Sequence, residues 1–130
     1  MAGDLEAIVR NLFAALDQRN FTAIQGMFGD DAQAIDEVSR RWLRNPDEIR
    51  ATIRQFEASI HNIHSDLRDV HEKSLGDTGL VTCWLEQDYT LEGQRQHVSA
   101  PTSVVLRRDA GTWQIVLLHS IPLSEVSSSW

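Results

Sequence analysis

The chain has 130 residues, of which 42% are hydrophobic and 24% are charged, and its formal net charge is -7. This length has room for one domain, and the acidic balance argues against a nucleic-acid partner, because phosphates are neutralised by a basic face. The single cysteine, Cys83, excludes an internal disulfide and is expected to be a small core residue. No apolar run approaches the roughly 18 residues of a membrane span, and the N-terminus lacks a basic segment before an apolar run, so we expect a cytoplasmic protein.

Helical periodicity dominates the first third of the chain. Apolar residues recur at i, i+3, i+4 and i+7 from Leu5 to Leu16, and a second, shorter stripe runs from Phe21 to Phe28. The sequence Gly29-Asp30-Asp31 is typical of a turn, and residues 32–38 are expected to form a short strand.

A third helix and then a sheet are predicted in the rest of the chain. Asn45 can cap a helix and Pro46 suits its first position. From about Ser65 the hydrophobic period becomes two, which indicates strands. The expected strands, separated by glycine-containing turns, are His71–Leu75, Leu80–Leu91, Gln96–Arg108 and Thr112–Leu123. This order predicts an α+β domain over residues 4–123 with helices on one sheet face, followed by a flexible tail at residues 124–130.

Hairpin pairing predicts which side chains share a face of the sheet. Glu92 is expected to pair with Arg95, and Asp109 with Thr112. The face under the helices then holds Val81, Cys83, Leu85, Gln87, Tyr89, Val98, Ala100, Thr102, Val104, Leu106, Trp113, Ile115, Leu117, His119 and Ile121. The opposite face holds Leu80, Trp84, Val105, Val116 and Leu118. A bulged turn at Gly111 would instead slip the last strand by one residue and exchange its faces.

Several segments together resemble a known family. Phe28–Ala32 after two helices, Asn45–Ile49, Gly111–Ile115 and His119-Ser120 are similar to the SnoaL-like group, and the resemblance covers roughly Leu5 to Leu123. That group belongs to the nuclear transport factor 2-like superfamily, which includes ketosteroid isomerases and the association domain of a calmodulin-dependent kinase. The resemblance implies a strongly curved antiparallel sheet wrapped around three helices into a cone. It also implies a pocket inside the cone and a convex face that commonly serves dimerisation.

The resemblance also marks Asp36 as a catalytic candidate. Residues 28–36 are similar to the segment that carries the proton-shuttling aspartate of ketosteroid isomerases, and Asp36 falls at that position. An aspartate with few partners at a pocket mouth can have a raised pKa and move protons. However, Leu12 stands where the isomerases have a tyrosine, and Val104 or its neighbours stand where they have a second acid, so no enolate stabiliser is evident. A strand-end aspartate in a solvated turn is the alternative.

His119 is the second catalytic candidate, expected on the inner face opposite Thr102. A buried neutral histidine bonded to a neighbouring side chain is the alternative. Gln87 and Tyr89 are expected to line the same cavity as hydrogen-bond donors, and Trp42 to close over it. The remaining expected lining residues are Thr102, Trp113, Ile115 and Leu117.

No metal or cofactor is expected. His61 and His64 would share a metal only on a helix, and no third ligand stands at a suitable spacing. The basic cluster of Arg40, Arg41 and Arg44 offers either a bidentate partner for an anion or a solvated loop that balances nearby acids.

Two functions stay open at this point. One is a small-molecule pocket protein, an isomerase, cyclase or hydratase acting on an apolar ring substrate, with Asp36 as acid/base and His119 among the orienting residues. The other is a non-catalytic, dimeric binding or association module. In both cases the apolar back face predicts a homodimer, unless residues 124–130 cover it. The expected interface is Leu80, Trp84, Val105, Val116 and Leu118.

Overall fold

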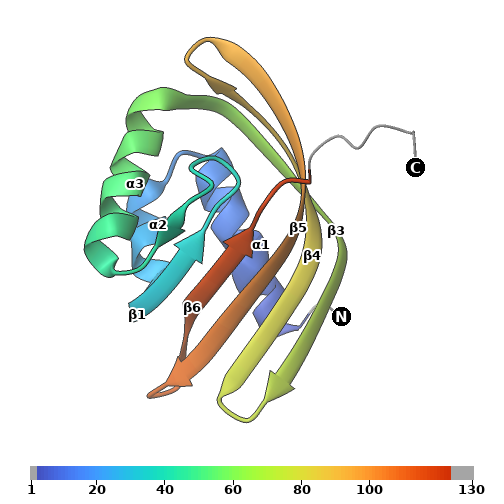
Figure 1. The fold of residues 1–130 in the computed structure, drawn as a ribbon. Helices are drawn as coiled ribbons and strands as arrows, with labels where there is room; N and C mark the ends of the chain where they lie inside the picture. Colours follow the sequence, from blue (N-terminus) through green and yellow to red (C-terminus); the bar gives the residue numbers. More distant parts are fainter. Residues whose placement is uncertain (1–2, 124–130) are drawn as a thin grey trace.

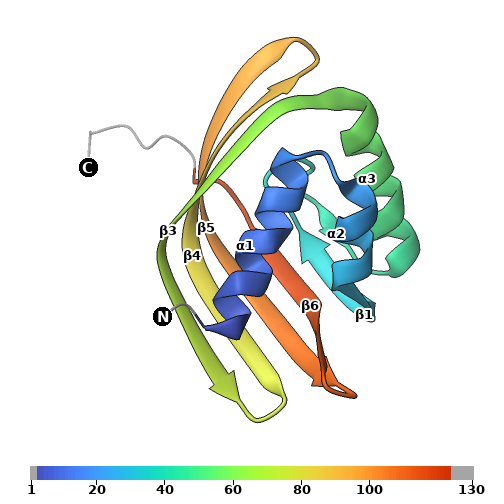
Figure 2. The same ribbon diagram turned by 180° about the vertical axis from the view of Figure 1, so that it is seen from behind.

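The computed structural model describes residues 3–123, which form three helices on the inner side of one strongly curved six-stranded sheet (Figure 1). The strand order is β2-β1-β6-β5-β4-β3. The elements are α1 (Asp4–Asp17), α2 (Phe21–Met27), β1 (Phe28–Ile35), β2 (Trp42–Leu43), α3 (Pro46–Ser59), β3 (Ile60–Leu75), β4 (Thr78–Leu91), β5 (Gln94–Asp109) and β6 (Thr112–Ser120). Seen from behind, α1 crosses the inner side of β3 and β4 (Figure 2). The predicted α+β class and curved sheet are confirmed.

Two of the three helices begin at an asparagine that caps them, and the cap at Asn45 is the one predicted. The side chain of Asn45 accepts a hydrogen bond of 2.9 Å from the Glu48 amide at the start of α3, and Asn20 does the same for the Ala23 amide in α2. These caps satisfy backbone donors that a helix N-terminus leaves without partners. The apolar stripe of α1 is buried against the sheet, as its spacing predicts.

The first strand differs from the prediction at both ends. Residues 29–31 are part of β1 rather than a turn, and β1 pairs in parallel with β6, so the sheet is mixed rather than purely antiparallel. Asp31 is held there by a bidentate ion pair with Arg107 of β5, with N–O distances of 2.9 and 3.0 Å. This long-range pairing overrides the turn-forming tendency of the local sequence. The strand ends at Ile35 because Asp36 begins a hydrogen-bonded turn.

The strand β3 begins at Ile60, earlier than the change of hydrophobic period at Ser65 predicts. Its register shifts twice, between His61 and His64 and between Arg68 and His71. Asn62 and Asp69 have positive φ angles of 54° and 53° at these shifts, and such bulges interrupt the alternation that reveals a strand in sequence.

The hairpin between β4 and β5 is offset by two residues from the expected pairing. Leu91 pairs with Gln94, and the turn residues are Glu92 and Gly93 with φ angles of 51° and 78°. Two positive φ angles in a two-residue loop match the right-handed twist of the flanking strands. A shift of two leaves the faces unchanged, so the ten inner-face residues predicted on β4 and β5 are all buried.

The last strand exchanges its faces halfway along. Asp109 pairs with Thr112 as predicted, but the register then shifts, so that Leu106 pairs with Ile115 and Val105 with Leu117. Val116 is the extra residue of this bulge. The alternative slip at Gly111 therefore occurs five residues later, inside the strand.

The consequence is that three predicted positions on β6 are wrong. Leu118 was expected on the outer face but is buried in the core, and Ser120 is fully buried as well. Leu117 and His119, expected inside, lie on the outer face beside Val105 and Ser103.

Candidate functional site

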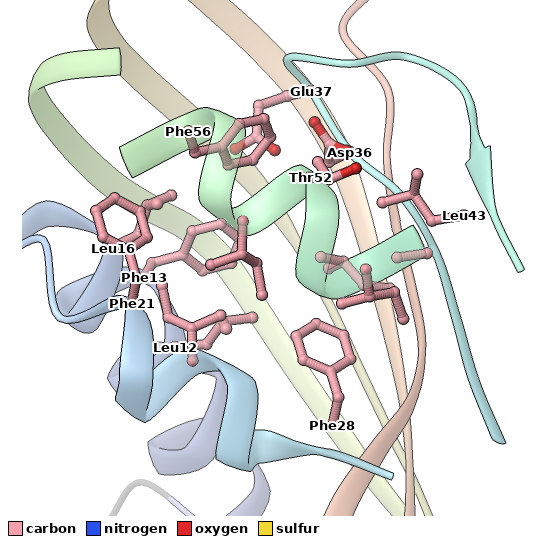
Figure 3. Close-up of a pocket in the computed structure, with 15 residues that line it drawn as sticks. Leu12, Phe13, Leu16, Phe21, Phe28, Asp36, Glu37, Leu43, Thr52 and Phe56 are labelled. Carbon is pink, nitrogen blue, oxygen red and sulfur yellow. The ribbon is translucent and has the colours of Figure 1, made fainter. Parts of the chain in front are cut away.

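A pocket lies on the inner side of the sheet, where the three helices meet β1 and the second half of β6 (Figure 3). The space between its lining atoms, open mouth included, is about 560 Å³. Its lining residues are Leu12, Phe13, Leu16, Phe21, Ile24, Phe28, Ala34, Asp36, Glu37, Leu43, Ile49, Thr52, Ile53, Phe56 and Leu118.

Helical spacing supplies most of the apolar wall. On α3, Ile49, Thr52, Ile53 and Phe56 recur at i, i+3, i+4 and i+7, so all four point to the same side. The stripes of α1 and α2 supply the facing wall. Only three of the fifteen side chains are polar, and Figure 3 shows them at one end of the pocket, away from Phe28.

Asp36 lines the pocket, but its carboxylate is occupied in a turn. Oδ1 accepts hydrogen bonds from the backbone amides of Val38 (2.9 Å) and Ser39 (2.7 Å), and Oδ2 accepts one from the Ser39 hydroxyl. An aspartate that bonds backbone amides two and three residues on is a common way to close a turn. Asp36 is therefore at the pocket, as expected, with a structural function in shaping the chain after β1.

Glu37 is the polar group that sequence reasoning missed. Its side chain is 3% exposed, and within residues 3–123 its Oε2 has no hydrogen-bond partner. Burial, and secondly the negative charge of Asp36, raise the pKa of Glu37 to about 7, while its own backbone, Gln87 and Arg40 act in the opposite direction. A carboxyl group in this state exchanges protons near neutral pH.

Thr52 places a second polar atom without a partner at the same end of the pocket. It is 1% exposed, and its Oγ1 makes no hydrogen bond to any other part of residues 3–123. A threonine inside a helix commonly bonds the carbonyl one turn earlier, so an unbonded hydroxyl is unusual. Buried polar atoms without partners are rare in folded proteins, and here two of them line one pocket.

Gln87 and Tyr89 lie next to this pocket rather than in it. They line a smaller adjoining cavity of about 210 Å³, whose wall includes Glu37 and also Leu16 and Phe56 of the main pocket. Gln87 donates a hydrogen bond of 3.0 Å to Ser65. Burial is the main cause that raises the pKa of Tyr89, and the charges of Glu37 and Asp36 add to it. Gln87 and Tyr89 were expected to line the same cavity as Asp36 and His119; they line the adjoining cavity instead, which shares Glu37 with the main pocket.

His119 and Asp36 lie on opposite sides of the sheet. The outward-facing His119 ring is 6.2 Å, between centroids, from Trp42 of β2, which is 40% exposed. The guanidinium of Arg44 lies 5.0 Å from the Trp42 ring. The structure therefore does not bring Asp36 and His119 together, because the β6 bulge turns this half of the strand around, and Trp42 does not line the pocket.

The remaining expected pocket residues are placed elsewhere on the sheet. Thr102 is buried and hydrogen-bonded at 2.9 Å to Ser120, which occupies the inner position expected for His119. Trp113 is at the start of β6, where its ring faces Arg108 at 5.1 Å. Neither residue lines the pocket, nor does the outward-facing Leu117.

Residues 3–123 contain no group of three or more histidine, cysteine, aspartate or glutamate side chains arranged to hold a metal. His61 and His64 are on a strand and exposed. Burial raises the pKa of Cys83 to about 11, which disfavours the nucleophilic thiolate. Over the same residues, no helix has the length and apolar character to cross a membrane.

Comparison with known proteins agrees with the fold. Residues 5–124 match the family model described as a SnoaL-like domain. Two similar crystal structures are a proposed aromatic ring hydroxylase from Novosphingobium aromaticivorans (TM-score 0.84, 16% identity, covering 95% of this chain and 89% of that one) and a proposed dehydratase of the NTF2-like family from Streptomyces avermitilis (0.82, 19%, 92% and 94%).

A third is a proposed calcium/calmodulin dependent protein kinase II association domain from Xanthomonas campestris (TM-score 0.81, 19% identity, 96% and 91%). At these identities the likeness establishes the shared fold alone. A search of curated protein sequences gives no match.

Proposed function

Since the chain belongs to the SnoaL-like domain family, we propose that its inner pocket binds a small, largely apolar molecule that carries one hydrogen-bonding group. The observation that supports this function is the pairing of an apolar wall with two buried polar atoms, Glu37 Oε2 and Thr52 Oγ1, that have no partner within residues 3–123. Leaving such atoms without hydrogen bonds costs about 1–3 kcal/mol each, and a ligand in the pocket would supply the missing bonds. Ligand sites typically combine an apolar wall with a few polar groups in this way.

An acid/base function in this pocket falls to Glu37 in our proposal rather than to Asp36. Asp36 accepts three hydrogen bonds that close its turn, so proton transfer through it would disturb the chain after β1. Glu37 has a pKa of about 7 and an oxygen that no other described group occupies. A group with that pKa is present in both protonation states at neutral pH, as acid/base catalysis requires. The dehydratase and aromatic ring hydroxylase activities proposed for two similar structures belong to those proteins; here the second one suggests ring-containing molecules for a first screen.

A titration followed by NMR tests the pocket directly. We expect 2-phenylethanol, which combines one ring with one hydroxyl, to shift the amide signals of Leu16, Thr52 and Phe56 in a saturable way. Ile24→Phe adds volume to the pocket wall and should abolish these shifts while the thermal transition stays cooperative. Shifts that persist in Ile24→Phe, or that map to outer-face residues such as Trp84, would contradict the pocket. Leu16→Phe serves as a second filling variant if Ile24→Phe does not fold.

We propose a second copy of this chain as the partner of the outer face. Trp84 is 38% exposed there, and Leu80, Val105, Val116 and Leu117 around it are half-buried. Leu118 leaves the originally expected set because it is in the core, and Leu117 takes its place. A shallow groove lies beside Trp84 and is lined also by Pro101 and Ser103. Side chains of a partner could fill this groove. Apolar surface of this kind stabilises an association by about 25 cal/mol per Å² buried.

Sedimentation distinguishes this dimer from a covering tail. We expect the wild type to sediment as a dimer at micromolar concentration and Trp84→Glu as a monomer. The predicted tail at residues 124–130 lies outside the described residues, so a chain that ends at Leu123 is the control. If the full chain is a monomer and the shortened chain associates, the tail rather than a second copy covers the face.

A further inference from the structure

We propose that the ligand of the inner pocket carries a protonated amine, so that its ammonium group pairs with Glu37 while its apolar body contacts the helices. This inference rests on the proposed function, because it specifies the class of molecule that the same pocket takes. It is supported by the kind of polar atoms at the pocket end. The Oε2 atom of an ionised Glu37 is purely an acceptor, and the Thr52 hydroxyl can accept as well. An ammonium group has three N–H donors and can serve both, whereas an alcohol has one.

The charged groups around Glu37 favour a cation over an anion. Asp36 and Arg40 are on the same segment as Glu37, Tyr89 comes from β4, and α1, α2, α3 and β3 contribute no charged side chain to the two cavities. Arg40 is exposed, and its Nε donates to the backbone oxygen of Glu37 at 3.0 Å. Its charge is also the smallest of the influences on Glu37. A ligand carboxylate would therefore meet two carboxyl groups with one weakly acting cation, and a ligand ammonium would supply the positive charge that the site lacks.

Binding of an amine should be coupled to a proton. Below pH 7 most Glu37 side chains are protonated, given their pKa of about 7. An arriving R–NH3+ group stabilises the carboxylate, so the Glu37 O–H bond breaks and its proton passes to the buffer, while the amine keeps all three of its own protons. Affinity should thus rise by about tenfold between pH 6 and pH 8 and then level off. A neutral alcohol would show no such dependence.

Three matched probes test the inference by calorimetry on the full chain: 2-phenylethylamine, 2-phenylethanol and 3-phenylpropanoate. We expect the amine to bind at least about tenfold more tightly than the alcohol, and the carboxylate to bind more weakly than both. At pH 6, titrations in buffers of different ionisation enthalpy should reveal the release of close to one proton per amine bound. Glu37→Gln should abolish the proton release and the preference for the amine while the alcohol still binds. Asp88→Asn, which removes a half-buried carboxylate on the outer face, is the control and should change neither.

The possible failures are distinct. If the amine and the alcohol bind equally, or if the carboxylate binds best, the amine inference is wrong and the small-molecule pocket stands. If none of the three binds, both the inference and the proposed function are contradicted for one-ring ligands. If Glu37→Gln does not fold, the proton release of the wild type decides alone: its absence at pH 6 would overturn the inference.

Discussion

The two faces of the sheet differ in whether their polar side chains have hydrogen-bond partners. On the outer face, the two ring nitrogens of His97 lie 2.8 Å from Asp88 Oδ1 and 3.2 Å from Glu86 Oε2, and Ser99 donates to the other oxygen of Glu86 at 2.9 Å. Every group in this network has a partner, and water can reach it. On the inner face, Glu37 and Thr52 are buried deeply, yet one oxygen of each has no partner within residues 3–123.

Among the described residues, the inner face therefore holds polar atoms that are free to bond a ligand, and the outer network does not. Exposed polar groups lose little when a partner is removed, since water replaces it. A buried polar atom without a partner is costly to the folded state, so its persistence points to a function beyond folding. If this reasoning holds, the two faces differ as strongly in energy as they do in geometry.

The largest difference should appear when the same apolar truncation is made on each side. Leu85 is 0% exposed in the core, whereas Leu75 is 59% exposed near the end of β3. Leu85→Ala should lower the free energy of unfolding by about 3 kcal/mol, because it removes buried methyl groups and leaves a cavity. Leu75→Ala should change it by less than about 0.5 kcal/mol. Denaturant unfolding of both variants measures this, and equal losses would mean that the inner core does not carry the stability.

Glu37 should give the unfolding free energy a pH dependence that no exposed carboxylate shares. Its pKa is about 7 in the folded chain and 4.5 in the absence of the fold. Since the folded pKa is the higher one, its contribution is complete below pH 4.5, declines as the pH rises and is lost above pH 7. The change corresponds to about 3 kcal/mol.

Unfolding curves of the wild type and of Glu37→Gln between pH 4 and pH 8 check this prediction. The wild type should lose stability over the interval from 4.5 to 7, and the variant should lack that part of the slope. Parallel curves for the two proteins would show that Glu37 is not buried as described.

Asp36→Ala should have a smaller, structural effect. The substitution removes the acceptor for the amides of Val38 and Ser39, which lie near the surface, so water can replace part of what is lost. We expect a decrease of about 2 kcal/mol in the free energy of unfolding. Asp36→Asn keeps an acceptor oxygen and should retain most of the stability. If Asp36→Ala is as stable as the wild type, the turn does not depend on this side chain.

The smallest effect should come from the outer network. The hydrogen bond to Asp88 raises the pKa of His97, so any stabilisation is complete below the unfolded pKa and is lost as the pH rises through the folded one. Because the pair is exposed, His97→Gln should lower the unfolding free energy at pH 6 by at most about 0.5 kcal/mol. NMR titration of the His97 ring gives its pKa directly. A loss above 1 kcal/mol would contradict the contrast between the faces.

The sequence contains enough information for the architecture because apolar spacing and capping residues act locally. The stripe from Leu5 to Leu16 and the cap at Asn45 each determine a helix without distant help. The inner residues of β4 and β5 follow equally from alternation, and a hairpin misplaced by two residues leaves them inside. Strand pairing is not local. The bidentate pair of Asp31 with Arg107 joins residues 76 positions apart, and the sequence near Gly29 does not predict it.

The candidate site could be predicted only in part, because burial and hydrogen-bond partners also depend on residues far apart in the sequence. Asp36 could be selected from its place after β1, but its three bonds to Val38 and Ser39 occupy it. Glu37 differs from it in burial and in lacking a partner for Oε2, and neither property is written in the residue type. In the sequence, only its position next to Asp36 could have indicated that Glu37 lies at the pocket. Thr52 was easier to find, since it is a polar residue that interrupts the apolar spacing of α3 between Ile49 and Phe56.

The extra residue Val116 determines which side chains of the second half of β6 face inward. Because Val116 has no partner on β5, deleting it alone would restore strict alternation and leave Leu118 and Ser120 on the inner side. If Val116 stayed and the bulge were straightened, regular pairing from Ile115 onward would bring Leu117 and His119 inside instead, and an ionisable ring would reach the inner side without any amino-acid substitution. In a fold shared by chains that are only 16–19% identical, the gain or loss of a bulge is a route by which one scaffold can acquire a new set of inward side chains.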